Sequence, residues 1–292
     1  MLSLGEQSYE DPEFIEISAY GRVYRARRPK DLEVVAVKEL ELARFPGDEW
    51  VYYREGVEKG FLFDHPHILP YYNFVYDGTR ALVEMEYCSG GSLSEFIRLH
   101  RKSKREGIDE LSIWAVATQL ANALAYLHTT FREGIPVVHR DVKPENILFT
   151  STGVLKLCDF GRASFLDGSP INRLTGTLFY MAPEIAQEKE YGSEVDIWSL
   201  GCVLYEMCGG DIITFHGAEL THDPYIDFGR YSEGLNQLIR NCLRYEPQQR
   251  ITAGEIMSLP EARLALETTI SMGATSIPTS PPSYRAISPA LR

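Results

Sequence analysis

Val138-His139-Arg140-Asp141-Val142-Lys143-Pro144-Glu145-Asn146 is the stretch that determines how the rest of the chain is interpreted. Pro144 prevents a helix from continuing through it, and the apolar run at 147–149 that follows predicts a short strand. We therefore expect a tight loop that presents the side chains of Asp141, Lys143 and Asn146 from one turn.

A second motif, Asp159-Phe160-Gly161, follows one hairpin later, after a turn predicted at Ser151-Thr152-Gly153. The hairpin should return Asp159 to the side of the first loop. Two carboxylates, an ammonium and an amide would then converge. Such a set suits phosphoryl transfer, which depends on positioning and on charge neutralisation around metal-bound phosphates.

The two motifs resemble the His-Arg-Asp and Asp-Phe-Gly motifs of the eukaryotic protein kinases, and the resemblance extends from about Phe14 to Leu259. It implies a bilobal α+β fold, with a small antiparallel β-sheet N-lobe that carries one helix and a larger α-helical C-lobe. It also implies ATP and Mg²⁺ as cofactors and protein serine or threonine hydroxyls as acceptors, since Lys143 resembles the serine/threonine subclass.

The resemblance assigns a role to each polar residue of the two motifs. Asp141 would orient and deprotonate the acceptor hydroxyl, and Lys143 would neutralise the phosphoryl group in transfer. Asn146 and Asp159 would hold Mg²⁺.

Lys38 ends the β-branched run Val34-Val35-Ala36-Val37-Lys38 and resembles the lysine that reaches the α- and β-phosphates. Its ion-pair partner should lie on the next helix, expected at 48–63. Glu55 is the predicted partner, and Glu58 remains the alternative.

The phosphate-covering loop departs from the family pattern Gly-x-Gly-x-x-Gly-x-Val. In the segment 16–23, Glu16 and Ser18 replace two glycines, while Gly21 and Val23 are retained. Glycine lets backbone N–H groups approach phosphate without interference from a Cβ atom. A pseudokinase scaffold with a degraded loop is therefore the alternative to an active enzyme.

The run Ala81 to Cys88 resembles the strand that leads into the adenine hinge. Met85 would lie behind the base, the backbone of Glu86 and Cys88 would bind it, and Ala36 would contact it.

In the second half of the chain, Glu184 and Arg250 should form a buried structural pair. Asp196 should cap a core helix and tie down the loop that contains Asp141. The segment at 131–136, together with the hinge sequence, resembles the NIMA-related group of kinases.

Bulk composition excludes several other classes. With 29 Lys and Arg against 41 Asp and Glu, the net charge of −12 argues against nucleic acid as the main ligand. The five cysteines lack metal-ligand spacing and are typical of a reducing compartment. No secretory signal and no membrane-spanning run is apparent, so we expect an intracellular protein, cytoplasmic or nuclear, without a membrane partner.

We expect a loose lead-in at residues 1–13 and a kinase domain at 14–267, with its N-lobe at about 14–87 and its C-lobe at about 93–267. The residues from 268 to 292 are rich in Ser, Pro and Thr and predict a disordered tail.

Overall fold

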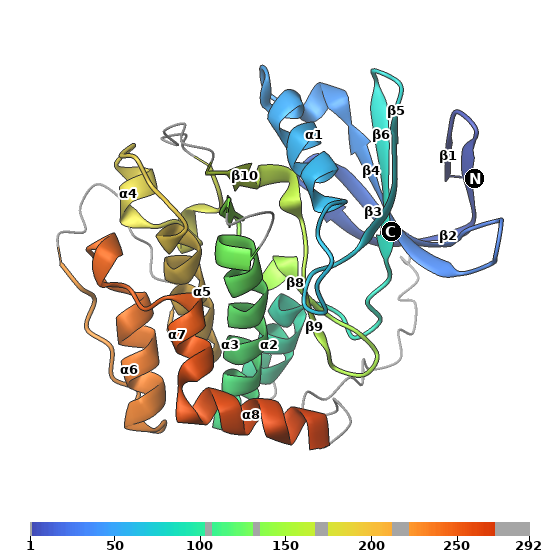
Figure 1. Ribbon diagram of the computed structural model, residues 1–292. Helices are drawn as coiled ribbons and strands as arrows, with labels where there is room; N and C mark the ends of the chain where they lie inside the picture. Colours follow the sequence, from blue (N-terminus) through green and yellow to red (C-terminus); the bar gives the residue numbers. More distant parts are fainter. Residues whose placement is uncertain (1, 103–106, 131–134, 167–174, 212–221, 272–292) are drawn as a thin grey trace, which may run out of the picture.

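The computed structural model describes residues 2–102, 107–130, 135–166, 175–211 and 222–271. These residues form two lobes, an antiparallel sheet with one helix and a second lobe built mainly of helices (Figure 1). The predicted bilobal α+β architecture is therefore confirmed.

The N-lobe sheet has six antiparallel strands in the order β1-β2-β3-β4-β6-β5. Their bounds are β1 Leu2–Leu4, β2 Gln7–Ser18, β3 Gly21–Arg27, β4 Val34–Glu41, β5 Tyr71–Tyr76 and β6 Arg80–Glu86. Alternation along β4 places Val35 and Val37 on one face and Ala36 and Leu40 on the other, where helix α1 (Glu49–Gly60) packs. Lys38 shares the second face, so strand periodicity alone directs it toward α1.

Residues 2–4 and 7–13 differ from the loose lead-in that we expected. They form β1 and the beginning of β2, and Leu2, Leu4 and Tyr9 are buried against Val35 and Val37. The surrounding polar residues hide this pattern in the sequence. Leu2, Leu4 and Tyr9 are scattered in the sequence, but the folded sheet brings all three against the same apolar face.

The C-lobe contains the remaining helices and four short strands. The helices are α2 Leu93–Lys102, α3 Glu110–Ala125, α4 Pro183–Ala186, α5 Glu194–Met207, α6 Glu233–Cys242, α7 Ala253–Ser258 and α8 Pro260–Ser271. The strands are β7 Val137–Val138, β8 Ile147–Phe149, β9 Leu155–Leu157 and β10 Ser164–Phe165. β8 and β9 form the hairpin predicted between the two sequence motifs.

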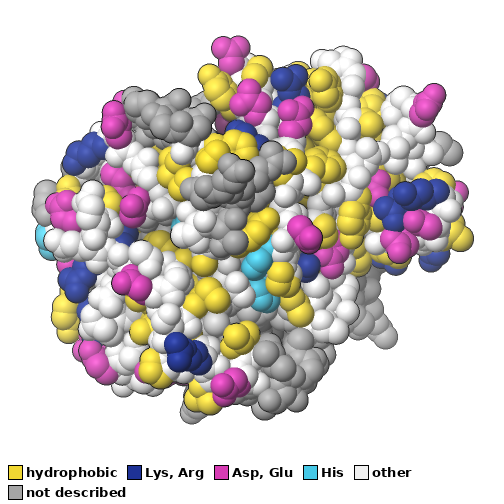
Figure 2. Space-filling view, viewed as in Figure 1, with side chains coloured by type: hydrophobic (Ala, Val, Ile, Leu, Met, Phe, Trp, Pro, Cys, Tyr) yellow, Lys and Arg dark blue, Asp and Glu magenta, His cyan; other side chains and the backbone are white. Residues whose placement is uncertain are grey.

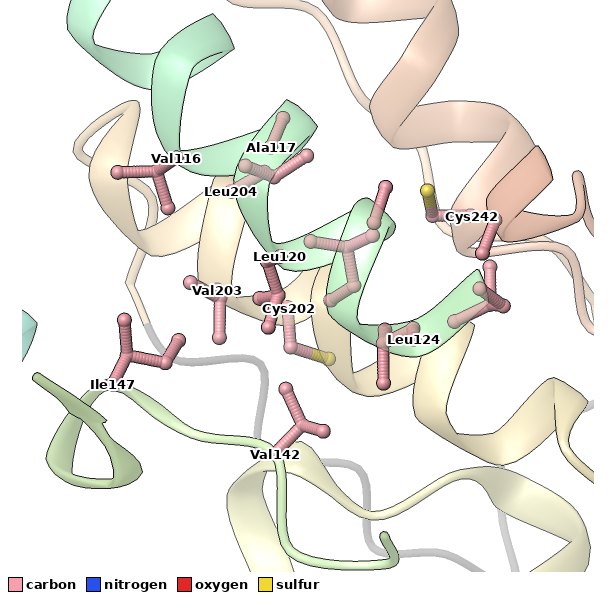
Figure 3. Packing of buried hydrophobic residues seen from close by; sticks show 14 of the residues in the cluster. Val116, Ala117, Leu120, Leu124, Val142, Ile147, Cys202, Val203, Leu204 and Cys242 are labelled. Carbon is pink, nitrogen blue, oxygen red and sulfur yellow. The ribbon is translucent and has the colours of Figure 1, made fainter. Parts of the chain in front are cut away.

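Helices α3 and α5 build the core beneath the loop that contains Asp141. Leu120 and Leu124 of α3 lie close to Val203 of α5, and Val142 and Ile147 project from the loop toward the same cluster (Figure 3). All five side chains are fully buried. The apolar residues of the motif therefore anchor it, while Asp141, Lys143 and Asn146 face the space between the lobes.

Helix α8 continues to Ser271, past the domain end predicted at residue 267. The rest of the predicted tail (272–292) and residues 131–134 of the segment at 131–136 lie outside the described residues. Acidic and basic side chains are interspersed on the face drawn in Figure 2. Among the described helices, none combines the length and the apolar character that a membrane crossing requires.

Candidate active site

A cleft of about 680 Å³ separates the two lobes. One part has apolar walls, formed by Val23 and Ala36 of the sheet, Met85 at the end of β6 and Leu148 of β8. The other part is polar, and the side chains that line it are Lys38, Asp141, Lys143, Asn146 and Asp159. The cleft therefore offers a slot for a flat apolar group beside a charged end.

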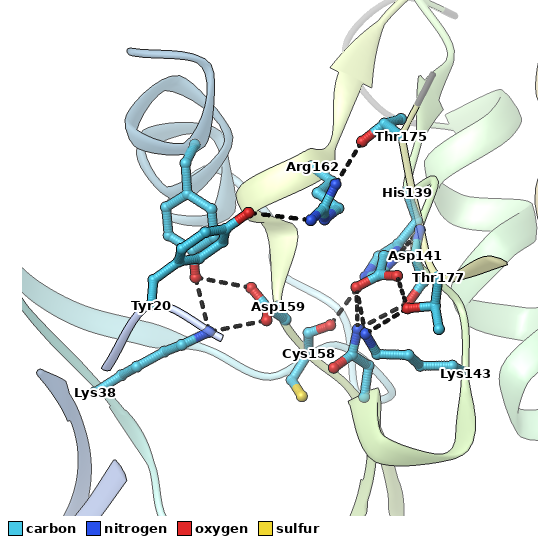
Figure 4. Close-up of polar contacts among 12 residues, drawn as sticks. Tyr20, Lys38, His139, Asp141, Lys143, Cys158, Asp159, Arg162, Thr175 and Thr177 are labelled. Carbon is cyan, nitrogen blue, oxygen red and sulfur yellow. Dashed lines mark hydrogen bonds and ion pairs between the residues drawn. The ribbon is translucent and has the colours of Figure 1, made fainter. Parts of the chain in front are cut away.

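Asp141 is the centre of the charged end (Figure 4). Lys143 Nζ lies 2.8 Å from its Oδ2, and Asn146 Nδ2 donates to the same oxygen at 3.0 Å and to the Asp141 carbonyl at 2.8 Å. Thr177 Oγ1 donates to Asp141 Oδ1 at 2.8 Å and accepts a hydrogen bond from Lys143. The three predicted catalytic side chains are thus brought together, with Thr177 added to them.

Buried Asp196, in the first turn of α5, holds this loop from behind. Its carboxylate accepts hydrogen bonds from the backbone N–H groups of His139 and Arg140, each at 2.8 Å, and lies 2.9 Å from His128 Nε2. Arg140 has a φ of 65°, a strained value that these bonds stabilise. The predicted tie is confirmed, although the N-cap of α5 is Ser193 and not Asp196.

The electrostatics of Asp196 follow from the same contacts. Burial acts to raise the pKa of this carboxyl, yet hydrogen bonding to His128 and the charges of the nearby histidines keep the pKa below its ordinary value. The group therefore holds the loop as an anion.

Lys38 and Asp159 point toward each other across the cleft (Figure 4) and form an ion pair of 2.8 Å. The second partner of Lys38 Nζ is the hydroxyl of Tyr53, at 2.7 Å. Tyr53 in turn donates to Asp159 Oδ1 at 3.0 Å. The prediction that Glu55 pairs with Lys38 is wrong, and so is the alternative, Glu58.

The phase of helix α1 explains this correction. Its buried positions are Tyr53, Gly56, Val57 and Gly60, which follow the i, i+3, i+4, i+7 pattern of one helix face. Glu55 and Glu58 are exposed on other faces, and Glu58 lies 3.6 Å from Arg54 of its own helix. The spacing of these four residues was the signal in the sequence that would have identified Tyr53.

Burial and the charge of Lys38 act in opposite directions on the pKa of Asp159. Burial acts to raise the pKa of Asp159, but the Lys38 ammonium and the hydrogen bonds from Lys38 and Tyr53 hold the pKa below its usual range. Burial beside the Asp159 carboxylate raises the pKa of Tyr53 well above its ordinary value. Tyr53 is therefore a neutral phenol that accepts from Lys38 and donates to Asp159.

The hairpin between β2 and β3 covers the cleft, and Glu16 and Val23 line it. Gly21 does not. It packs against β4, where an added Cβ would lie 1.8 Å from the Glu39 carbonyl oxygen. Tyr20, at the tip of the hairpin, stacks on Phe45 with ring centroids 3.9 Å apart.

The predicted hinge residues Met85, Glu86 and Cys88 also line the cleft. The Glu86 carboxylate lies 3.2 Å from Lys156 of β9, so its side chain is engaged away from the backbone groups assigned to the adenine. In the C-lobe, Arg250 donates to both carboxylate oxygens of Glu184, at 2.6 and 2.8 Å, which confirms the predicted structural pair.

A family model described as the protein kinase domain matches residues 9–260. The chain belongs to the protein kinase family. It is 35% identical to the serine/threonine-protein kinase Nek2 of Mus musculus over 269 residues, which cover 87% of this chain and 60% of Nek2.

Two further relatives widen the comparison. The chain is 31% identical to the serine/threonine-protein kinase Nek9 of Mus musculus, over 84% of this chain and 25% of that protein. It is also 31% identical to the Aurora kinase C of Mus musculus, over 84% of this chain and 87% of that protein. The two Nek kinases agree with the predicted resemblance to the NIMA-related group. The chain spans 60% of the length of Nek2 and 25% of the length of Nek9.

Proposed function

We propose that the chain is an ATP-dependent serine/threonine protein kinase. The observation that carries the proposal is the convergence of Lys38, Asp141, Asn146 and Asp159 at the charged end of a cleft with apolar walls. The names of the relatives, two serine/threonine-protein kinases and an Aurora kinase, support the same reaction class.

The residues present fit a nucleotide and a divalent cation. The apolar walls suit a purine ring, and Glu86 and Cys88 of the hinge line the cleft, where their backbone groups could bind that ring. Asn146 donates its amide N–H to Asp141, which leaves its amide oxygen to join the Asp159 carboxylate as cation ligands. Amide and carboxylate oxygens are the donors that Mg²⁺ prefers.

ATP, when bound with Mg²⁺, supplies the γ-phosphoryl group that is transferred. Lys38 would hold the α- and β-phosphates. Asp141 would orient the acceptor hydroxyl and accept its proton, while Lys143, 2.8 Å from Asp141, would neutralise charge on the transferred group. Thr177 bonds to both Asp141 and Lys143 and so fixes their relative positions.

The rest of the functional assignment belongs to the same proposal. The substrates would be proteins with serine or threonine acceptors, and the site of action would be inside the cell. Residues 14–267 would make up the kinase domain, with β1 and the first half of β2 as an extension of its sheet.

The test is phosphate transfer from radiolabelled ATP to a generic basic protein, with Mg²⁺ present. Asp141→Asn should lower turnover by orders of magnitude, because the variant loses the proton acceptor and keeps the shape of the side chain. Its melting temperature should stay close to that of the wild type. Equal rates in the two proteins would overturn the assignment of an enzyme.

A pseudokinase scaffold is the second candidate, and two observations favour it. Glutamate and serine replace two loop glycines, and the partner of Lys38 on α1 is a tyrosine instead of an acid. A protein that binds nucleotide but shows no phosphate transfer dependent on Asp141 would support this candidate.

A further inference from the structure

Tyr53 is the one residue of α1 whose side chain reaches the charged end of the cleft within the described part of the chain. Only 5% of the residue is exposed, and its ring lies between Phe45, at a centroid distance of 5.2 Å, and Gly161. An added Cβ at Gly161 would lie 2.1 Å from that ring. Packing on both faces of the Tyr53 ring therefore fixes the position of its hydroxyl.

The hydrogen bonds of this hydroxyl define what it can do. It accepts from Lys38 Nζ at 2.7 Å and donates to Asp159 Oδ1 at 3.0 Å. One neutral group thus fixes both an ammonium and a carboxylate. A carboxylate at the same point would accept from Lys38 equally well, but it would face Asp159 as a like charge.

We propose that Tyr53 is the positioning residue for Lys38, and that its hydroxyl does this without adding a negative charge beside Asp159. The proposal rests on the nucleotide site of the proposed function. The Lys38 side chain is 12% exposed, and among the described residues Asp159 is the one acidic group that forms an ion pair with it. When Asp159 turns to a cation, Tyr53 is the contact that keeps the ammonium aimed at the phosphates.

The experiment measures ADP binding by calorimetry in the presence of Mg²⁺, on the full chain. Tyr53→Phe keeps the ring and removes the hydroxyl, so affinity should fall about ten-fold, the amount expected for a hydrogen bond to a charged group. Tyr52→Phe makes the same chemical change at an exposed position on the same helix and should leave affinity unchanged. Denaturant unfolding of both variants checks that the fold persists.

A double-mutant cycle with Lys38→Met separates positioning from packing. If Tyr53 acts through Lys38, then Tyr53→Phe should have little further effect on ADP affinity once Lys38 is replaced. A structural role would instead give the same loss in both backgrounds, and that result would overturn the proposal. The cycle is read from binding alone, so a modest change in stability does not obscure it.

The same measurements distinguish this inference from the proposed function. A wild type that binds ADP, with an equally tight Tyr53→Phe variant, refutes the role of Tyr53 and leaves the nucleotide site standing. A wild type that fails to bind ADP refutes the nucleotide site and the inference with it. In activity assays, the variant should lose more in kcat than Tyr52→Phe loses.

Discussion

Glu16 and Ser18, near the end of β2, are the residues that most alter the charge and shape of the nucleotide-facing loop. Desolvation raises the pKa of Glu16, although the residue is exposed; Lys38 opposes this rise, and the carboxylates of Asp159, Glu145 and Glu95 add to it. Ser18 Oγ is buried without a hydrogen-bond partner among the described residues. The Glu16 carboxylate opposes an anionic ligand, and Ser18 adds a Cβ at a position where the family pattern has glycine.

The double change Glu16→Gly and Ser18→Gly should therefore tighten ATP binding several-fold. At an effective dielectric of about 20 and a separation of roughly 8 Å, the carboxylate repels a phosphate charge by about 2 kcal/mol before screening. Salt and Mg²⁺ should reduce this to on the order of 1 kcal/mol. Calorimetry at low and high salt measures the gain, which should shrink as salt is added.

The single change Glu16→Gln separates charge from backbone shape in this prediction. Glu16→Gln should give the salt-dependent part of the gain in ATP affinity. It should not give the part that comes from the shape of the backbone. Unchanged or weaker binding in the double variant would show that the loop does not restrict the nucleotide.

At the scale of elements, helix α1 packs closely against the Asp-Phe-Gly motif beside the site. A Cβ added at Gly56 would lie 2.2 Å from the carbonyl oxygen of Phe160. Phe160 is itself fully buried and packs against Phe63 at a centroid distance of 4.8 Å. The helix therefore has no room to yield toward the C-lobe, and its position fixes that of Tyr53.

Gly56→Ala should destabilise the protein by about 1–3 kcal/mol, the cost of overpacking a close contact, despite the better helix propensity of alanine. Gly254→Ala in α7 is the matched control, because no atom lies within 4 Å of the added Cβ. That variant should gain about 0.4–1 kcal/mol. Urea unfolding of both measures the difference, and equal effects would contradict the packing argument.

The elements that local sequence determines were predicted well, and those that depend on contacts between elements were not. The loop around Asp141 and the hairpin to Asp159 follow from Pro144, the apolar runs and one turn. The partner of Lys38 depends instead on which face of α1 meets the sheet, and the predicted Glu55 lies two residues after the actual partner, Tyr53. Strand β1 was not predicted, because its leucines become buried only against the face of the folded sheet.

At the scale of the whole molecule, Asp196 joins the core of the C-lobe to the catalytic loop. It is completely buried, and its pKa is depressed from the ordinary 3.8, so the unfolded chain binds more protons than the native one as pH falls below about 5. The stabilisation is complete above that range and is lost as pH falls through the native pKa.

Asp196→Asn should therefore lower the unfolding free energy at pH 7 by on the order of 2 kcal/mol and flatten its dependence on pH below about 5. Chemical unfolding monitored at several pH values measures both effects. Asp227→Asn changes an exposed carboxyl and should leave the curve as it is in the wild type. A variant that keeps the full acid dependence would mean that other carboxyls control it.

The aromatic cluster around Tyr53 limits how the chain can evolve. The Tyr53 ring contacts those of Tyr20 and Phe45 at centroid distances of 5.6 and 5.2 Å. Glutamate at position 53 would leave much of the volume of that ring empty, at a cost approaching the 3–5 kcal/mol of an aromatic truncation. It would also place a second carboxylate beside Asp159. A single substitution at position 53 therefore cannot give Lys38 an acidic partner on α1 at low cost, and the neighbouring rings favour retention of the tyrosine.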